Sequence, residues 1–384
     1  MEFHRGAVSP SRPDDQSRVV LVGPGPGTRG GIAQFNMHLA EALLDQGAAV
    51  QMLTFARLYP SWTRPGRQAA ASTDAIPAGV RVKEVLVAWR PWTWFAGVRF
   101  VRETSPTVVV FQWWHPMFAF CYIALSLAAH ASGAQVVFVC HNAEPHESFP
   151  FSRVLTRLAL RRGDQLFALS ESVSQALAVV APRGRITCLG HPPYTALSHV
   201  DGSARDAWLD RIDAGSKKIV LFFGNVRPYK GLSDLIAAFP EIRSHVQAVL
   251  VVAGTFFESI DAHRARINEL GIEEDVRLFS GYVPDGEVGA LLSVADLIVL
   301  PYRSGSQTGI VPLAASVGTP VVVTAVGGIA EGLGTGARAA PPGDPGALAA
   351  AVVASLELPP ANPPATARWE EWAHALIASG ARAR

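Results

Sequence analysis

The sequence predicts an α/β protein built from two doubly wound, Rossmann-like domains that face each other across a cleft. Short β-branched runs alternate with helix patterns along most of the chain, which is typical of parallel sheets. The alternation stops at a proline-rich, polar stretch at 191–204 and then starts again. The chain has 384 residues, 49% of them hydrophobic, and this is enough apolar material for two cores.

Six β-branched or aromatic runs predict the strands of the first domain. The first run, at 18–25, ends in glycines, and a helix is expected over 31–47 because Phe35, Leu39 and Leu43 recur at helical spacing. The other elements of this domain are expected strands at 49–55, 80–89, 107–112, 134–141 and 164–170, and a helix at 171–180.

The second domain repeats this architecture without repeating the sequence. Its strands are expected at 217–225, 246–254, 275–283, 296–302 and 320–328. The expected organisation is a disordered tail at 1–17, a first domain at 18–192, a linker at 193–215, a second domain at 216–357, and a proline-rich stretch with a helix at 358–384.

Charge and cysteine content exclude several classes of protein. The net charge of +1 gives no reason to expect a nucleic-acid partner. Three scattered cysteines without metal-ligand spacing indicate a reducing compartment, so we expect a cytoplasmic protein. The polar N-terminal stretch lacks the apolar core of a signal peptide. His115 and Pro116 interrupt the apolar segment 108–130, which predicts a strand and a core helix rather than a membrane span.

Two loops of the second domain have the composition of a diphosphate cradle. Each follows a buried strand and precedes a helix start, where free backbone N–H groups and the helix dipole favour an anion. The first loop carries the cations Arg227 and Lys230. The second loop carries small and polar residues: Ser304, Ser306, Gln307, Thr308 and Gly309. Together the two loops predict a nucleotide-sugar site.

A glycine-rich turn after the first strand fits the pattern GxGxxG, from Gly25 to Gly30, but that pattern alone is a weak signal. A dinucleotide site also needs an acidic residue at the end of the second strand. This chain has Thr54 and Phe55 there, so an NAD-dependent oxidoreductase is the lesser alternative. Gly30 and Gly31 either let the backbone approach a ligand across the cleft or only permit the turn.

With these motifs in view, the chain resembles the retaining nucleotide-sugar glycosyltransferases of the GT-B fold, the large family four group. The resemblance extends from about residue 18 to 355 and is strongest at 218–332. It is carried by Gly30-Gly31, CHNAEPHE (140–147), LSES (169–172), GNVRPYKGLSDLI (224–236), VVAG (251–254), VRLFSGYVPDGEV (276–288), ADLIVLPY (295–302) and VGTPVVVTAVGGIAE (317–331). It implies an acceptor-binding first domain, a donor-binding second domain, and no metal or cofactor besides the nucleoside-diphosphate sugar as co-substrate.

The resemblance implies catalytic roles for His141, Arg227 and Lys230. Lys230 matches the family's lysine on the donor diphosphate, whereas Asn225 occupies the position of the usual arginine and Arg227 stands in the same loop. His141 matches a histidine that faces the cleft, with a satisfied core histidine as the alternative. The implied donor contacts are Gly30, Gly31, Asn225, Gly281, Tyr282, Val283, Ser306, Gln307, Thr308, Gly309 and Ile310.

The expected acceptor contacts lie after two strands of the first domain. Asn142, Glu144 and His146 follow His141, and the last two either bind acceptor or brace the loop. Trp114 and His115 either contact a sugar or fill the wall between the domains. In addition, Ser170 and Glu171 either line the cleft or cap the following helix.

The chain departs from the family at two positions. Most members carry two glutamates eight residues apart around the final cleft loop, and alignment places Gly305 and Leu313 there. A QTG-type loop followed by a PLA helix, as in one branch of the family, stands in their place. We therefore expect Gln307 and Thr308 to contact the sugar or distal phosphate. A degenerate relative that holds nucleotide without turnover is the alternative.

The acceptor side gives less specific signals. The segment 87–103 mixes tryptophans with arginines, which suits either a membrane interface or a helix with an aromatic core face. The resemblance implies bacterial polysaccharide or glycolipid synthesis. The expected partners are a nucleotide-sugar donor and a sugar or lipid-linked acceptor, with peripheral contact at the inner face of the membrane left open.

Overall fold

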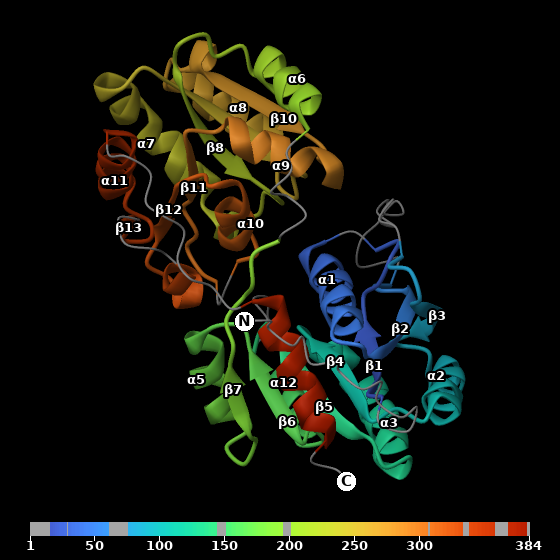
Figure 1. Ribbon diagram of the computed structural model, residues 1–384. Coiled ribbons are helices and arrows are strands. Elements are labelled where there is room, and N and C mark those ends of the chain that lie inside the picture. Colours follow the sequence, from blue (N-terminus) through green and yellow to red (C-terminus); the bar gives the residue numbers. More distant parts are fainter. Residues whose placement is uncertain are drawn as a thin grey trace, which may run out of the picture.

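The computed structural model consists of two parallel sheets with helices on both faces, one half stacked on the other (Figure 1). It describes residues 16–28, 30–60, 76–143, 151–194, 201–305, 308–332, 338–357 and 368–381. Most of the expected tail at 1–17 lies outside these ranges. The two halves are the architecture that the sequence predicts.

The N-terminal half contains a seven-stranded sheet in the order β3-β2-β1-β4-β5-β6-β7. Its strands are β1 (Arg18–Gly23), β2 (Ala49–Arg57), β3 (Arg81–Val87), β4 (Val108–Trp113), β5 (Gln135–Cys140), β6 (Gln165–Ala168) and β7 (Ile186–Cys188). The central strands are buried on both faces, which explains their nearly continuous apolar sequences. The order reverses between β1 and β4, and ligands of open α/β sheets bind at such a switch point.

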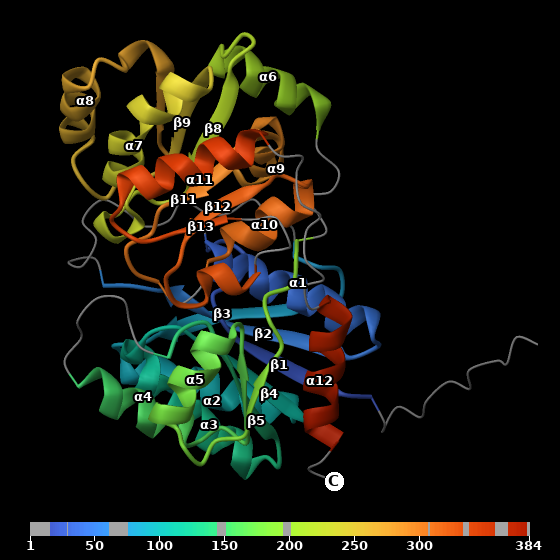
Figure 2. The ribbon, with the colours of Figure 1, turned by 90° about the vertical axis from the view of Figure 1, so that its left-hand side faces the viewer.

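Two layers of helices cover this sheet (Figure 2). One layer holds α2 (Pro91–Thr104), η3 (Pro116–Phe118), α3 (Ala119–Ala131), α4 (Ser152–Leu160) and α5 (Glu171–Val180). The other holds α1 (Gly31–Asp45) and the last helix, α12 (Trp369–Ala381). Trp369 and Trp372 of α12 join the core under α1, so the chain returns to the N-terminal half at its end.

The C-terminal half contains a six-stranded sheet in the order β10-β9-β8-β11-β12-β13. Its strands are β8 (Lys218–Phe223), β9 (Ala248–Gly254), β10 (Val276–Ser280), β11 (Leu297–Leu300), β12 (Val321–Thr324) and β13 (Arg338–Ala340). Its helices are α6 (Gly202–Ile212), η5 (Pro228–Lys230), α7 (Leu232–His245), α8 (Ile260–Glu269), η6 (Glu273–Asp275), α9 (Asp285–Val294), α10 (Ile310–Val317), η7 (Gly327–Gly332) and α11 (Pro345–Glu357).

Two sequence expectations can be compared directly with these elements. The apolar segment 108–130 forms β4, η3 and most of α3, as expected, and no helix within the described ranges combines the length and hydropathy of a membrane span. The expected linker 193–215 differs, because it contains α6. Trp208 and Ile212, one helical turn apart, are buried in the C-terminal core and fix that helix there.

Candidate active site

A cavity of about 310 Å³ lies between the two halves. The N-terminal half contributes Gly30, Gly31 and Gln34, which follow β1. The C-terminal half contributes the loops after its strands: Phe223, Gly224, Asn225, Tyr229, Lys230, Gly254, Thr255, Gly281, Tyr282, Val283, Asp285, Val288, Tyr302, Gly305, Thr308, Gly309, Ile310 and Leu313. The carboxyl edges of both sheets therefore meet at the cavity, and its volume suits a small ligand.

Glycines bring the strand-end loops of the C-terminal half close together. Gly231, at the start of α7, has φ of 68°, and a Cβ there would collide with the carbonyl oxygen of Pro301. Gly254 has φ of 148°, and its Cβ would collide with the carbonyl oxygen of Gly224. Only glycine combines these conformations with these contacts. The glycines thus leave backbone, rather than side chains, along the cavity wall.

The two predicted cations occupy different places. Lys230 lines the cavity, with its Nζ 5.2 Å from the centre of the Tyr302 ring. Arg227 is not among the lining residues, and its guanidinium lies 4.2 Å from the centre of the Phe257 ring. The structure therefore brings Lys230 to the site directly, whereas Arg227 would have to turn from the aromatic ring to reach a ligand.

The loop between β11 and α10 lies on the same wall. Thr308, Gly309 and Ile310 line the cavity, and Ile310 begins α10. The Ile310 N–H donates to Thr308 Oγ1 at 3.2 Å, so an anion at this helix start would have to displace that bond. Ser306 and Gln307 lie outside the described residues.

An ion pair ties this loop to the loop that carries Lys230. Arg303 donates from Nε to Asp234 Oδ2 at 2.8 Å and from Nη2 to Asp234 Oδ1 at 2.6 Å. The Arg303 N–H also donates to the Tyr229 carbonyl at 2.7 Å. Asp234 lies in the first turn of α7 and is buried. This two-pronged pair fixes the spacing of the two loops, and sequence reasoning did not single out either residue.

The two positions without glutamates, Gly305 and Leu313, both line the cavity. A Cβ at Gly305 would lie 2.8 Å from Ile329 Cδ1, so a longer side chain needs a shift of that isoleucine. Leu313 packs against the cores of both halves. At this position the chain has an apolar contact between the halves in place of a carboxylate.

The lining of the cavity also includes Gly281, Tyr282 and Val283, three of the donor contacts that the resemblance implies. Beside them Asp285 begins α9, and Gln34 Nε2 of the N-terminal half donates to its Oδ1 at 2.9 Å. Sequence reasoning missed Gln34, Tyr229, Thr255, Asp285 and Tyr302. All follow strands at the carboxyl edge, and this position was the only available signal.

His141 follows β5 but lies apart from the cavity, with 3% of its surface exposed. Asn36 Nδ2 donates to the Pro24 carbonyl, Gln112 Nε2 donates to Asn36 Oδ1, and His141 Nε2 lies 2.7 Å from Gln112 Oε1. Because a carbonyl only accepts, the chain of bonds makes His141 Nε2 the donor. Burial, with a smaller effect of His191, lowers the pKa of His141 to about 3, so the ring is neutral.

Three other expected contacts on the N-terminal side, Trp114, His115 and Asn142, are also absent from the described cavity lining. Trp114 is buried in the core, where its Nε1 donates to Tyr59 Oη at 3.2 Å, and His115 Nδ1 accepts from the Met117 N–H. Asn142 is partly buried after β5, and Glu144 and His146 lie outside the described residues. Ser170 Oγ accepts a hydrogen bond from the Val173 N–H. Ser170 therefore caps the helix that follows it, which was one of the two expected roles.

Two family models match the chain. The model described as Glycosyl transferase 4-like domain matches residues 30–190, and the model described as Glycosyl transferases group 1 matches residues 217–357. The matches thus fall on the two halves that contribute to the cavity.

Curated relatives and solved structures agree with the models. An uncharacterized glycosyltransferase of Methanocaldococcus jannaschii is 37% identical over 177 residues, 44% of each chain. A GDP-mannose:glycolipid 4-beta-D-mannosyltransferase of Xanthomonas campestris is 26% identical over 211 residues, 53% of each chain. The chain thus spans about half the length of these relatives.

The fold of an Anabaena protein, HepE, crystallised with UDP, superposes with a TM-score of 0.67 at 17% identity, over 95% of this chain and 94% of that one. This likeness concerns the fold, whereas the two family models concern the sequence. By its sequence and its fold, the chain belongs to the group 1 (family four) glycosyltransferases of the GT-B fold.

Proposed function

We propose that the protein is a hexosyltransferase that moves a sugar from a nucleoside-diphosphate sugar to an acceptor hydroxyl with retention of anomeric configuration. One observation carries the proposal: the glycine-lined cavity between the halves is lined both by Lys230, which follows β8, and by the Gly281–Val283 loop, which follows β10. A ligand with a diphosphate for the lysine and a planar base for the glycine-containing loop suits this lining.

The residues of the C-terminal half would bind the donor. Lys230 places a cation beside the backbone of Gly224 and Asn225, where a diphosphate would lie. Arg227 would complete the cradle after turning away from Phe257. With Leu313 in place of a carboxylate, Asp285 remains the acidic side chain that lines the described cavity wall, and we assign it to a ribose hydroxyl.

The reaction would be a same-face substitution. The bond from the anomeric carbon to the donor phosphate breaks as the acceptor oxygen bonds to that carbon, and the departing phosphate takes the acceptor proton. Lys230 stabilises the charge that develops on the diphosphate. The described residues contain no group of three metal-ligating side chains, and metal independence stays a prediction.

The acceptor belongs to the N-terminal side. The Xanthomonas relative is named for a glycolipid acceptor. This likeness supports a sugar or lipid-linked acceptor. With it we propose a cytoplasmic protein at the inner face of the membrane and a role in bacterial polysaccharide or glycolipid synthesis. Donor base is open, because that relative is named for GDP-mannose and the Anabaena structure holds UDP.

Calorimetry with UDP, GDP, ADP, NAD and their sugar conjugates, in the presence of EDTA, tests the proposal. We expect one nucleoside diphosphate to bind and its sugar conjugate to be consumed. Lys230→Ala should lose binding, whereas Lys218→Ala, an exposed lysine paired with Asp296, should retain it. Preference for NAD, or no binding of any nucleotide, would overturn the proposal.

A second candidate, a nucleotide-binding module without turnover, is favoured by the absence of carboxylates at Gly305 and Leu313. Donor hydrolysis in the absence of acceptor separates the two functions. Tight nucleotide binding without any release of sugar, across donors with different sugars, would favour the module.

A further inference from the structure

Exposed apolar side chains gather on one layer of the N-terminal half. Among the described residues, eleven large hydrophobic side chains are exposed, and eight of them lie on α2, α3, α4 and α5 or at their ends. These helices contact one another in order, so they form a continuous layer on one face of the sheet. Soluble surfaces rarely concentrate apolar side chains in this way. We call this layer the α2–α5 face.

Helix α4 has the most regular pattern on this face. Phe151, Val154 and Leu158 are 79%, 56% and 41% exposed and recur at the spacing of one helix stripe. The opposite side of the helix packs inward through Thr156 and Ala159. The exposed stripe is therefore a second apolar face, one that no described part of the chain buries.

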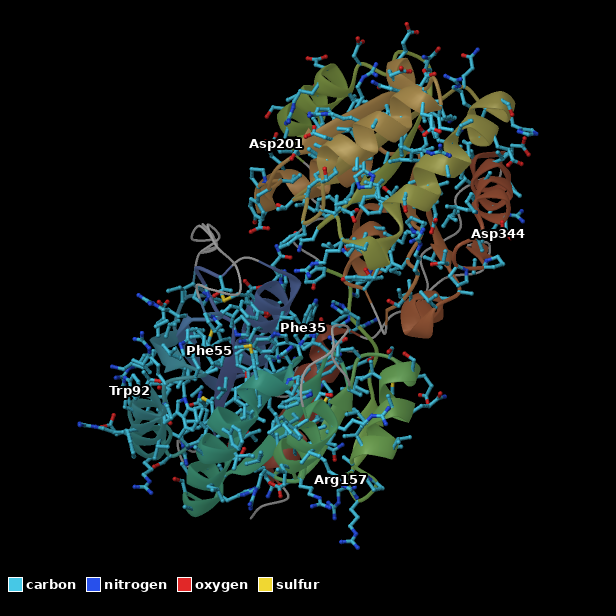
Figure 3. All side chains as sticks on the ribbon, turned by 180° about the vertical axis from the view of Figure 1, so that it is seen from behind. Phe35, Phe55, Trp92, Arg157, Asp201 and Asp344 are labelled. Atoms are coloured by element: carbon cyan, nitrogen blue, oxygen red, sulfur yellow. The ribbon has the colours of Figure 1, made fainter. Side chains whose placement is uncertain are left out.

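Arginines flank this stripe. Arg153, Arg157, Arg161 and Arg162 are all exposed, and the stretch 151–163 contains no acidic residue. The next acidic residue, Asp164, accepts from the Val136 N–H at 2.8 Å. In Figure 3, Arg157 lies at the rim of the N-terminal half, away from the C-terminal half.

Helix α2 also carries exposed apolar side chains beside an arginine on this face. Trp92 and Phe95 are 65% and 75% exposed, and the Arg90 guanidinium lies 5.9 Å from the centre of the Trp92 ring. Phe100 and Val101 of this helix are buried. The segment 87–103 therefore has a core face and an exposed aromatic end. The sequence left two alternatives for this segment, an aromatic core face and a membrane interface, and each of these two parts suits one of them.

We propose that the α2–α5 face docks on a lipid bilayer that carries anionic headgroups, with α4 as its principal contact. Arginines reach phosphate headgroups while the apolar stripe enters the acyl boundary, and both contributions strengthen binding. The positive charge of the exposed arginines complements anionic lipid headgroups, and this favours a bilayer as the partner. A second copy of the chain, docked through the same face by a two-fold axis, would bring the arginines of both copies together.

The face also has a useful position. Its helices begin at the carboxyl edge of the sheet, the edge that Gly30 and Gly31 present to the cavity. A bilayer on this face would hold a membrane-borne acceptor near that edge. Docking stands on the geometry of the face alone, whereas its use in delivering an acceptor rests on the proposed function.

Flotation of the full chain with vesicles tests the docking surface. Phosphatidylcholine vesicles are compared with vesicles in which one quarter of the lipid is phosphatidylglycerol, without donor or acceptor. We expect binding only to the anionic vesicles, weakened by high salt. Arg157→Glu with Arg161→Glu should reduce partitioning about tenfold or more, and Phe151→Ser with Leu158→Ser should reduce it on the same vesicles.

The matched control is Arg205→Glu with Arg264→Glu, which makes the same charge change at exposed arginines of the C-terminal half. It should float like the wild type. Thermal melting and nucleoside-diphosphate binding are read for every variant, so failure of docking is distinguished from misfolding and from failure of the proposed function. No flotation, equal flotation with both vesicles, or equal loss in the control would overturn the proposal. A dimer that disappears in the Phe151/Leu158 variant, without vesicle binding, would assign the face to a second copy.

Discussion

The two halves share one architecture but use the same edge of it differently. At the carboxyl edge of the C-terminal sheet, glycines border a cavity that Lys230 and Asp285 line. At the carboxyl edge of the N-terminal sheet, Asn36, Gln112 and His141 bond to one another and are buried. The polar groups of one edge line a cavity, whereas those of the other are buried in a network of their own.

This difference shows that a polar residue after a parallel strand is not by itself a ligand contact. A buried polar group needs a partner, and either a ligand or another side chain can supply it. In the C-terminal half, the tight turns of Gly231 and Gly254 bring backbone close together and leave no side chain of their own at these positions. In the N-terminal half, Gln112 reaches across and closes the network. Variants at the two edges should therefore affect different properties.

The largest effect is expected at the open edge. Lys230→Ala should lower kcat/KM by roughly 10²–10³-fold, because it removes a positioned charge that stabilises the departing diphosphate. The melting temperature should change little, since the side chain is only partly buried. Steady-state kinetics and thermal melting check this together. Loss of stability in proportion to activity would instead make Lys230 part of the internal packing.

The sequence predicted part of this edge. The glycines, the K-G pair and the alternation of strands predicted the two sheets, the loops and Lys230 on the cavity wall. Sequence could not reveal that Arg227 lies over Phe257, or that Gln112 is the partner of His141 Nε2, because both depend on side chains distant along the chain. Gln34 and Asp285 are 251 positions apart, and only the packing of the two halves brings them together.

The next effect should come from the link between the two loops of the open edge. Asp234→Asn breaks the two-pronged bond to Arg303 and should lower the free energy of unfolding by about 2 kcal/mol, less than for a fully buried pair, because Arg303 is half exposed. Activity should fall by about tenfold as the loops lose their spacing. Urea unfolding and kinetics measure the two effects.

The control for this link is Glu269→Gln, which breaks the exposed pair with Arg266. That change should alter stability by no more than about 0.5 kcal/mol. If Asp234→Asn behaves like this control in both assays, the two loops keep their spacing without the link.

A smaller effect is expected at the closed edge. His141→Ala leaves Gln112 Oε1 without its donor and should cost about 1–2 kcal/mol of unfolding free energy. The turnover rate at saturating substrate should be largely retained. This is the reverse of Lys230→Ala, which should lower activity and leave stability almost unchanged. The catalytic role implied by the family resemblance makes the opposite prediction, a turnover rate reduced by roughly 10²-fold or more without loss of stability. Parallel unfolding and kinetic measurements on the two variants decide between them.

The smallest effect is the pH dependence of the closed edge. Burial holds the pKa of His141 at about 3 in the folded state, against about 6.5 in the unfolded chain. Above pH 6.5 the ring is neutral in both states, and the native stability is fully present. As the pH falls below 6.5, His141 becomes protonated in the unfolded chain but stays neutral in the folded protein. Stability is therefore lost progressively toward pH 3.

Between pH 7.5 and 5.5 this histidine should account for about 1 kcal/mol of that loss. His191, whose pKa burial lowers to about 4, should contribute in the same direction. Urea unfolding across this range should therefore give a steeper decline for the wild type than for His141→Gln, which keeps a donor for Gln112 but cannot titrate. Identical slopes in the two proteins would mean that His141 is already exposed to protons in the folded state, and the closed edge would then resemble the open one.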